Sequence, residues 1–295
     1  SVSRFKTTND KLEWQNDIRM MGDDAIIVGL DYLKQRVDFE DGFGGVIDKQ
    51  RQSAAAFIGY VAKFAGGHLL QLNLRHDHFS DVGNRTTGLL GGGFAITDRL
   101  TISAMISTAF RAPTFVDLYY PFGLGNPNLK PERARSAEIG IQYAHTHGLA
   151  KLVYFRNRLK DLIGFDGNTT VNINRAKSDG LELSYDAEFG DTTLRLSATR
   201  QNAIDETTGE RLLRRAKQFA ALRLGRRVGD WNFSGELIGS GSKQDIRVDD
   251  FTRVRTPGYG LVNLKSTYNL NKQMRLQLQL DNVFDKRYQL AHGYN

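Results

Sequence analysis

The sequence predicts an all-β fold, an antiparallel transmembrane β-barrel of which about 14 strands lie in this chain. Three observations support this prediction. Apolar and polar residues alternate with a period of two, short turns and longer polar connections follow one another, and no window holds the ~20 consecutive apolar residues of a spanning helix. A soluble antiparallel sandwich would also alternate, but its strands average only about five or six residues.

The predicted strands begin near Leu12, and five segments show the alternation most clearly. In each segment Leu, Ile, Ala or Tyr occupies every second position. Successive side chains of a strand leave opposite faces of the sheet, so this period gives each strand one apolar face. The five segments are residues 70–75, 100–106, 139–143, 194–199 and 275–280.

Two kinds of connection separate the strands. The short ones contain Gly, Asn or Asp, which tolerate the positive φ of tight hairpins, and they lie at 22–24, 66–67, 97–99, 190–191, 229–230 and 271–272. The long ones lie near 38–50, 80–86, 111–133, 164–172, 203–212 and 242–256. Barrels of the bacterial outer membrane have short periplasmic turns and long extracellular loops, so this sorting predicts that membrane.

The charge balance is basic, with 40 Lys and Arg against 33 Asp and Glu and a net charge of +7. The basic residues are spread along the chain and form no stripe, so we expect no nucleic-acid partner. Solvated loops and a polar lumen explain them, and contact with lipid phosphates is an additional use. The chain has no cysteine, which suits a protein that crosses an oxidising periplasm.

The longest connection carries two proline-containing segments, FRAP at 110–113 and GNPNLKPE at 125–132. Proline lacks the N–H that a strand ladder needs, so these segments end one strand and delay the next. Between them lie Tyr119, Tyr120 and Phe122, apolar residues in a segment that should face water. Exposed aromatic side chains on a loop favour a binding surface. The alternative is that they pack the loop together.

These segments give the chain a family resemblance. FRAP, GNPNLKPE and the sequence NVFDKRY at 282–288 occur here in an order and at separations similar to those of TonB-dependent outer-membrane receptors. The strand segment SDGLEL at 178–183 also resembles that family. The resemblance covers the chain from about residue 100 to its end. It implies an active importer that binds a scarce substrate at its extracellular loops.

Within this family, the chain resembles the cobalamin receptor branch. The resemblance rests on LLRRAKQ at 212–218, TPGYGLVNL at 256–264 and the ending at 288–295. It implies that the corrinoid contacts Arg214 and one of Tyr119, Tyr120 and Phe122. An arginine can donate hydrogen bonds in a fork to the amide and phosphate oxygens of cobalamin. The alternative is a solvated loop arginine.

The same loop motifs bear on other ligands and on another class of membrane protein. Haem receptors of this family place a ligating histidine between the two loop motifs, and residues 114–126 contain none. Ferric-siderophore receptors share the general motifs and remain the main rival. A passive porin is the alternative from a different class, but a porin should lack the FRAP and GNPNLKPE pair.

We expect no metal site, no cofactor and no catalytic residue, so the prediction is that this is not an enzyme. His76 and His78 share a strand face with Asp81 just beyond, but two histidines and one distant carboxylate make a thin site. No Ser and His spacing singles out a nucleophile. The glycines at 91–93 lie in a strand and not at a helix start, which excludes a phosphate cradle.

The resemblance also implies parts and partners. Such receptors have a plug domain and a barrel of about 22 strands, so residues 1–295 are expected to be one partial barrel domain without the plug and the last strand. The expected partners are the corrinoid or metal-chelate substrate, the TonB complex acting through the plug, and outer-membrane lipid including lipopolysaccharide. We expect a monomer that passes the outer membrane of a Gram-negative bacterium many times.

Overall fold

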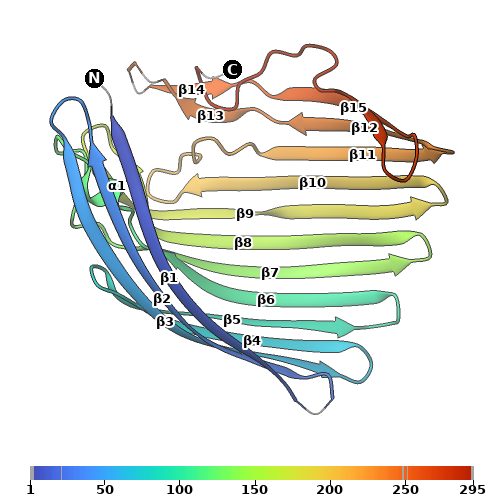
Figure 1. Cartoon of the computed structure of the whole chain (residues 1–295), viewed down its shortest axis with the longest axis horizontal. Coiled ribbons are helices and arrows are strands. Elements are labelled where there is room, and N and C mark those ends of the chain that lie inside the picture. Colours follow the sequence, from blue (N-terminus) through green and yellow to red (C-terminus); the bar gives the residue numbers. More distant parts are fainter. Residues whose placement is uncertain (1–2, 21, 248, 251, 294–295) are drawn as a thin grey trace. The chain divides into compact units, whose positions relative to one another are not determined.

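A computed structural model describes residues 3–20, 22–247, 249–250 and 252–293, and for 173–174 the backbone alone (Figure 1). The ending at 288–295 therefore lies partly outside the described residues. The described part contains sixteen strands and one short helix, α1 (Phe115–Tyr119). Fourteen strands form one sheet in the order β1 to β12, β15, β16, while β13 and β14 form a separate hairpin. The predicted all-β fold with about 14 strands in one sheet is confirmed.

The bounds of the strands show how long most of them are. They are β1 (Arg4–Arg19), β2 (Ala25–Glu40), β3 (Val46–Phe64), β4 (His68–Phe79), β5 (Gly83–Ala95), β6 (Leu100–Arg111), β7 (Glu132–His145), β8 (Gly148–Phe165), β9 (Thr170–Phe189), β10 (Thr192–Asp205), β11 (Gln218–Val228), β12 (Trp231–Ser240), β13 (Lys243–Ile246), β14 (Arg253–Thr256), β15 (Tyr259–Asn269) and β16 (Arg275–Leu280). Most therefore match or exceed the ~9–11 residues that span a bilayer core. No helix in the described ranges is long and apolar enough to cross a membrane.

The chain divides into two compact units, each described by itself. Unit 1 comprises Ser1–Phe94, Ser103–Ala137 and Asn157–Ala176. In it, β3 and β4 pair so that Ile58 lies opposite Leu74 and Ala62 opposite Leu70. The next residues along β4 are polar and leave the other face. The register therefore places the apolar residues of both strands on the same face of the sheet, as the alternation at 70–75 predicts.

Unit 2 comprises Ala95–Ile102, Glu138–Arg156 and Lys177–Asn295. Its five consecutive strands β10, β11, β12, β15 and β16 carry a continuous apolar face. Leu196 lies opposite Leu222, Leu222 opposite Leu237, and Leu237 opposite Val262. Large apolar side chains of this face, such as Leu237 and Leu278, are exposed. An apolar face left open over so many strands is suited to lipid chains.

The connections confirm the expected turns but correct several of the expected loops. All six predicted turns are present, and Gly22, Gly66 and Gly190 adopt positive φ there. The connections near 38–50, 80–86 and 164–172 were expected to be long, and this is wrong, because they shrink to 41–45, 80–82 and 166–169. The polar residues beside them continue the strands, as in the Arg36–Asp48 pair at 3.3 Å. Three described connections are long, at 112–131, 206–217 and 241–258.

Candidate functional site

The connection 112–131 is a folded loop that begins with a capped helical turn. The Asp117 amide donates to Thr114 Oγ1 at 3.1 Å, and the Thr114 amide donates to Asp117 Oδ2 at 2.8 Å. This capping box satisfies two amides that the start of α1 leaves without helical partners. The chain then folds back, because the Gly125 amide donates to the Tyr120 carbonyl at 3.0 Å. A Cβ on Gly125 would lie 2.4 Å from the Tyr120 amide nitrogen, so only glycine fits.

The two loop motifs contact each other, which explains why they occur together. Arg111 of FRAP donates through Nε and Nη2 to the two carboxylate oxygens of Glu132 at 2.8 and 2.7 Å. Glu132 ends GNPNLKPE and also accepts from the Ile163 amide at 2.8 Å. From the same motif, Asn126 donates to the Thr170 carbonyl at 3.0 Å. A two-bond Arg–carboxylate fork fixes both position and angle, so the motifs set the path of the loop.

A buried arginine that was not among the predicted site residues fastens the start of this loop to the sheet. Arg51 of β3 is 5% exposed. Its Nη2 lies 2.6 Å from Asp81 Oδ2 in the connection 80–82, and it donates to the Pro113 carbonyl at 2.8 Å. Its guanidinium also lies 5.1 Å from the ring centre of Phe115. One cation thus joins β3, a neighbouring connection and the start of α1.

The three predicted aromatic residues of the loop behave differently from one another. Lys49 Nζ lies 5.0 Å from the ring centre of Tyr119, and the Tyr120 and Phe39 rings lie 5.7 Å apart. Tyr119 and Tyr120 therefore pack within unit 1. Phe122 is 64% exposed and has a φ of 63°, a conformation that bulky residues rarely adopt. Phe43 in the connection 41–45 is 81% exposed and was missed, because that segment carried no motif.

The fourth predicted site residue, Arg214, lies in unit 2, in the connection 206–217. Its backbone has a φ of 58°, and its amide donates to the Gln244 carbonyl at 2.7 Å. Its side chain is 53% exposed, while Nε donates to Asp245 Oδ1 at 2.9 Å. Its Nη groups have no protein partner among the described residues. The backbone and Nε of Arg214 are therefore held by hydrogen bonds, and its Nη groups remain available to a ligand. The three aromatic residues belong to unit 1.

Asp245 of β13 is completely buried, and no sequence motif points to it. Burial alone would raise the pKa of its carboxyl group. Hydrogen bonds from the His292 amide, the Arg214 guanidinium and the Ile246 amide outweigh burial, so the pKa is lowered from its ordinary value of 3.8. Asp245 is thus a carboxylate at neutral pH. It lies in the hairpin of the connection 241–258, outside the spanning strands.

The third family motif also builds its own segment. The Asn282 amide donates to Asn263 Oδ1 at 2.9 Å, and Asn282 Oδ1 accepts from the Lys286 amide at 2.9 Å. Val283 donates its amide to the Val262 carbonyl at 2.9 Å. The start of NVFDKRY is therefore fastened to β15, and the chain that follows it is directed toward β13.

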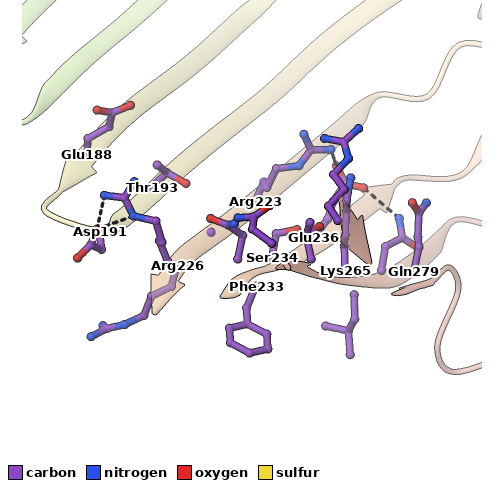
Figure 2. A pocket seen from close by; sticks show the side chains of 18 of the residues that line it. Glu188, Asp191, Thr193, Arg223, Arg226, Phe233, Ser234, Glu236, Lys265 and Gln279 are labelled. Carbon is purple, nitrogen blue, oxygen red and sulfur yellow. Dashed lines mark hydrogen bonds and ion pairs between the residues drawn. The ribbon is translucent and has the colours of Figure 1, made fainter. Parts of the chain in front are cut away.

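A polar concave surface of unit 2 offers a second candidate site, with a cavity of about 750 Å³ (Figure 2). Arg223 Nη2 lies 2.8 Å from Glu236 Oε1, and Asn263 donates to Glu236 Oε2 at 3.0 Å. Figure 2 shows the Phe233 ring on the opposite side of the ribbon from Arg223 and Glu236. Both signs of charge line the cavity. This arrangement suits contact with another polar protein surface.

His76 and His78, the two histidines that share a strand face, form hydrogen bonds with uncharged side chains. His76 Nδ1 lies 2.8 Å from Thr86 Oγ1, and His78 Nδ1 lies 2.7 Å from Asn84 Oδ1. Asp81, which the sequence placed near them, instead pairs with Arg51. Across the described ranges, no group of three or more His, Cys, Asp or Glu side chains is arranged to hold a metal ion.

Comparisons with known proteins place this geometry in context. The family model described as TonB dependent receptor-like, beta-barrel matches residues 2–283. The chain is 27% identical to the vitamin B12 transporter BtuB of Vibrio vulnificus, over 97% of this chain and 47% of the relative. It is 25% identical to BtuB of Photobacterium profundum, over 100% of this chain and 49% of the relative. The chain thus spans about half the length of the curated relatives it matches.

Solved structures show the same fold. A mutant of the ferric enterobactin receptor PfeA of Pseudomonas aeruginosa superposes with a TM-score of 0.82 at 22% identity, over 96% of this chain and 49% of that one. The copper transporter OprC gives 0.83 at 18% identity, over 99% and 53%. The siderophore receptor PirA of Acinetobacter baumannii gives 0.81 at 19% identity, over 99% and 53%. At these identities the likeness concerns the fold alone.

Proposed function

Since the chain belongs to the TonB-dependent receptor-like β-barrel family, whose members are outer-membrane transporters of Gram-negative bacteria, we propose that it forms barrel wall and ligand-binding loops of a cobalamin importer. The observation that carries the choice of ligand is Arg214. It stands in the LLRRAKQ segment that resembles the cobalamin branch, and it is open to solvent while its Nε is held by a buried carboxylate. The match to two vitamin B12 transporters over nearly the whole chain supports the same choice.

The chemistry of a corrinoid suits the exposed residues. Cobalamin carries amide side groups and a phosphate, all of which accept hydrogen bonds. The two Nη groups of Arg214 offer four N–H donors beyond the one that Asp245 uses. In unit 1, exposed Phe122 offers an aromatic face for apolar contact. Tyr119 and Tyr120 support the loop that carries Phe122, and we assign them a positioning role.

The proposed partners follow from the family and from the surfaces of the chain. The TonB complex would supply energy through a plug domain. The polar cavity of unit 2 offers a surface that the plug domain could contact. The exposed apolar face of β10, β11, β12, β15 and β16 would contact outer-membrane lipid. Ala198, Ala220 and Gly239 line an apolar groove of about 580 Å³ there, and Arg200 at its edge could meet a phosphate of phospholipid or lipopolysaccharide. The receptor would act as a multi-pass monomer and would make or break no bond.

The ligand is tested by titrating the full-length protein that carries this chain with cyanocobalamin and, in parallel, with ferric enterobactin. We expect saturable cobalamin binding with a Kd on the order of nanomolar. Arg214→Ala should weaken it, whereas the neighbouring Arg215→Ala, a matched control, should not. Saturable binding of the ferric chelate alone would assign the siderophore alternative. Passive diffusion of small solutes without saturable binding would favour the porin alternative.

A further inference from the structure

One buried carboxylate joins three segments of unit 2 that lie far apart in the chain. Asp245 Oδ1 accepts from Arg214 Nε of the connection 206–217 and from its own hairpin through the Ile246 amide, each at 2.9 Å. Asp245 Oδ2 accepts from the His292 amide of the segment after β16 at 2.8 Å. A buried carboxylate needs such partners, because an uncompensated charge in this position would be strongly destabilising.

The contact with Asp245 determines where the Arg214 guanidinium lies. Arg214 has a left-handed backbone, and its amide is bound to the Gln244 carbonyl next to Asp245 in the chain. Backbone and side chain are therefore both fastened to β13, at adjacent residues. An arginine side chain has many rotamers and loses freedom when a ligand binds it. Fixing Nε in advance removes part of that cost, while the side chain as a whole stays 53% exposed.

The same strand fastens the segment 281–293. Lys243, two residues before Asp245, donates through Nζ to the Leu290 carbonyl, and it is itself nearly buried. The segment is therefore held to β13 at two points, the Leu290 carbonyl and the His292 amide. Since Asp245 makes one of these two contacts and also holds Arg214, the position of the arginine and the attachment of the segment depend on the same side chain.

We propose that Asp245 is the positioning residue of the ligand-binding arginine, and that it couples Arg214 to the attachment of the segment 281–293. This inference rests on the proposed function only in assuming that Arg214 contacts the transported ligand. Asp245 itself is too buried to touch that ligand. Its contribution to affinity is therefore expected to pass entirely through Arg214.

A double-mutant cycle in the full-length protein tests this. With cyanocobalamin as the probe, Arg214→Ala and Asp245→Asn should each raise the Kd by about tenfold, and the double variant should be no weaker than Arg214→Ala. Asp250→Asn is the matched control, because Asp250 lies in the same hairpin, is exposed, and accepts hydrogen bonds from the amide and the hydroxyl group of Thr252. It should leave the Kd unchanged. If Asp245→Asn weakens binding equally in the Arg214→Ala background, a purely structural role is shown and the proposal is overturned.

A ligand-free measurement separates this inference from the choice of ligand. Hydrogen exchange of the peptide that contains the His292 amide should rise at least about tenfold in Asp245→Asn and stay unchanged in Asp250→Asn. Unchanged exchange in Asp245→Asn would overturn the coupling. If the wild-type protein binds no cyanocobalamin, the proposed function fails, and the cycle with ferric enterobactin still decides whether Asp245 positions Arg214.

Discussion

Replacing Arg51 by methionine should release the loop 112–131 from the sheet. The guanidinium makes three kinds of contact at once, with the Asp81 carboxylate, the Pro113 carbonyl and the Phe115 ring. Methionine retains much of the apolar volume but leaves Asp81 without its cation. Removing one member of a buried ion pair costs about 3–5 kcal/mol. Because Asp81 is partly exposed and can recover some hydration, the lower end of that range is expected here.

Hydrogen exchange by mass spectrometry gives the assay. A loss of about 3 kcal/mol corresponds to roughly a hundredfold increase in local opening. The increase should appear in the amides of Leu118, Gly125 and Asn126, which bond within the loop. Strands of unit 2 should be unaffected.

The matched control for Arg51 is Arg36→Met, which removes an ion pair of the same two residue types from an exposed site on β2. Exposed pairs contribute about 0–1 kcal/mol, so exchange should change less than about fivefold. The reasoning is refuted if Arg51→Met leaves loop exchange within about threefold of wild type. An equal effect of the two substitutions would also refute it, because the buried ion pair would then contribute no more to stability than the exposed one.

Three further predictions concern the loop, the buried carboxylate and the exposed aromatic residue. Gly125→Ala places a Cβ 2.4 Å from the Tyr120 amide nitrogen and should destabilise the loop by about 1–3 kcal/mol. Hydrogen exchange should then be faster in residues 112–131 alone. Unchanged exchange would contradict this prediction and show that α1 can shift to make room. Asp245 has a lowered pKa, so its stabilising contribution is present above the ordinary value of 3.8 and is lost only as pH falls through the lowered value. Proteolytic protection of the segment 281–293 should therefore be constant from neutral pH down to about 4, and a loss of protection between neutrality and that pH would contradict the assignment. Phe122→Ser should change stability by less than about 0.5 kcal/mol while weakening cobalamin binding, whereas Tyr120→Ser should also speed loop exchange; if Phe122→Ser leaves the Kd unchanged, that residue is outside the site.

The sequence predicts the strands best where one face is apolar. In residues 70–75 and 194–199 every second side chain is apolar, and both segments lie within strands as expected. The signal ends where both faces of a strand are polar. Residues 48–50 were expected in a loop because no side chain there is apolar, yet they belong to β3. There the backbone hydrogen bonds and the ion pairs between neighbouring strands hold the strand. Neither kind of contact produces an alternation of apolar and polar residues in the sequence.

The site shows a similar limit. Sequence motifs point to Arg214 and the loop aromatic residues as candidates, but they do not show which residues hold these side chains in place. Asp245 is 31 residues from Arg214, and Asp81 is 30 residues from Arg51. The pairing of β3 with β4 brings Arg51 near Asp81, and folding of the connection 206–217 against β13 brings Arg214 to Asp245. Neither Asp81 nor Asp245 lies in a recognisable motif. The Arg111–Glu132 fork differs, because both members lie in recognised motifs even though their contact becomes visible only in the structure.

Uptake of radiolabelled cyanocobalamin by a Gram-negative strain that lacks its own cobalamin receptor tests the central claim most directly. The strain would carry the full-length protein with this chain, with and without an intact TonB. We expect saturable uptake that requires TonB and is lowered about tenfold at limiting cobalamin by Arg214→Ala. Uptake that persists without TonB, or that is absent while a ferric chelate is imported, would contradict it.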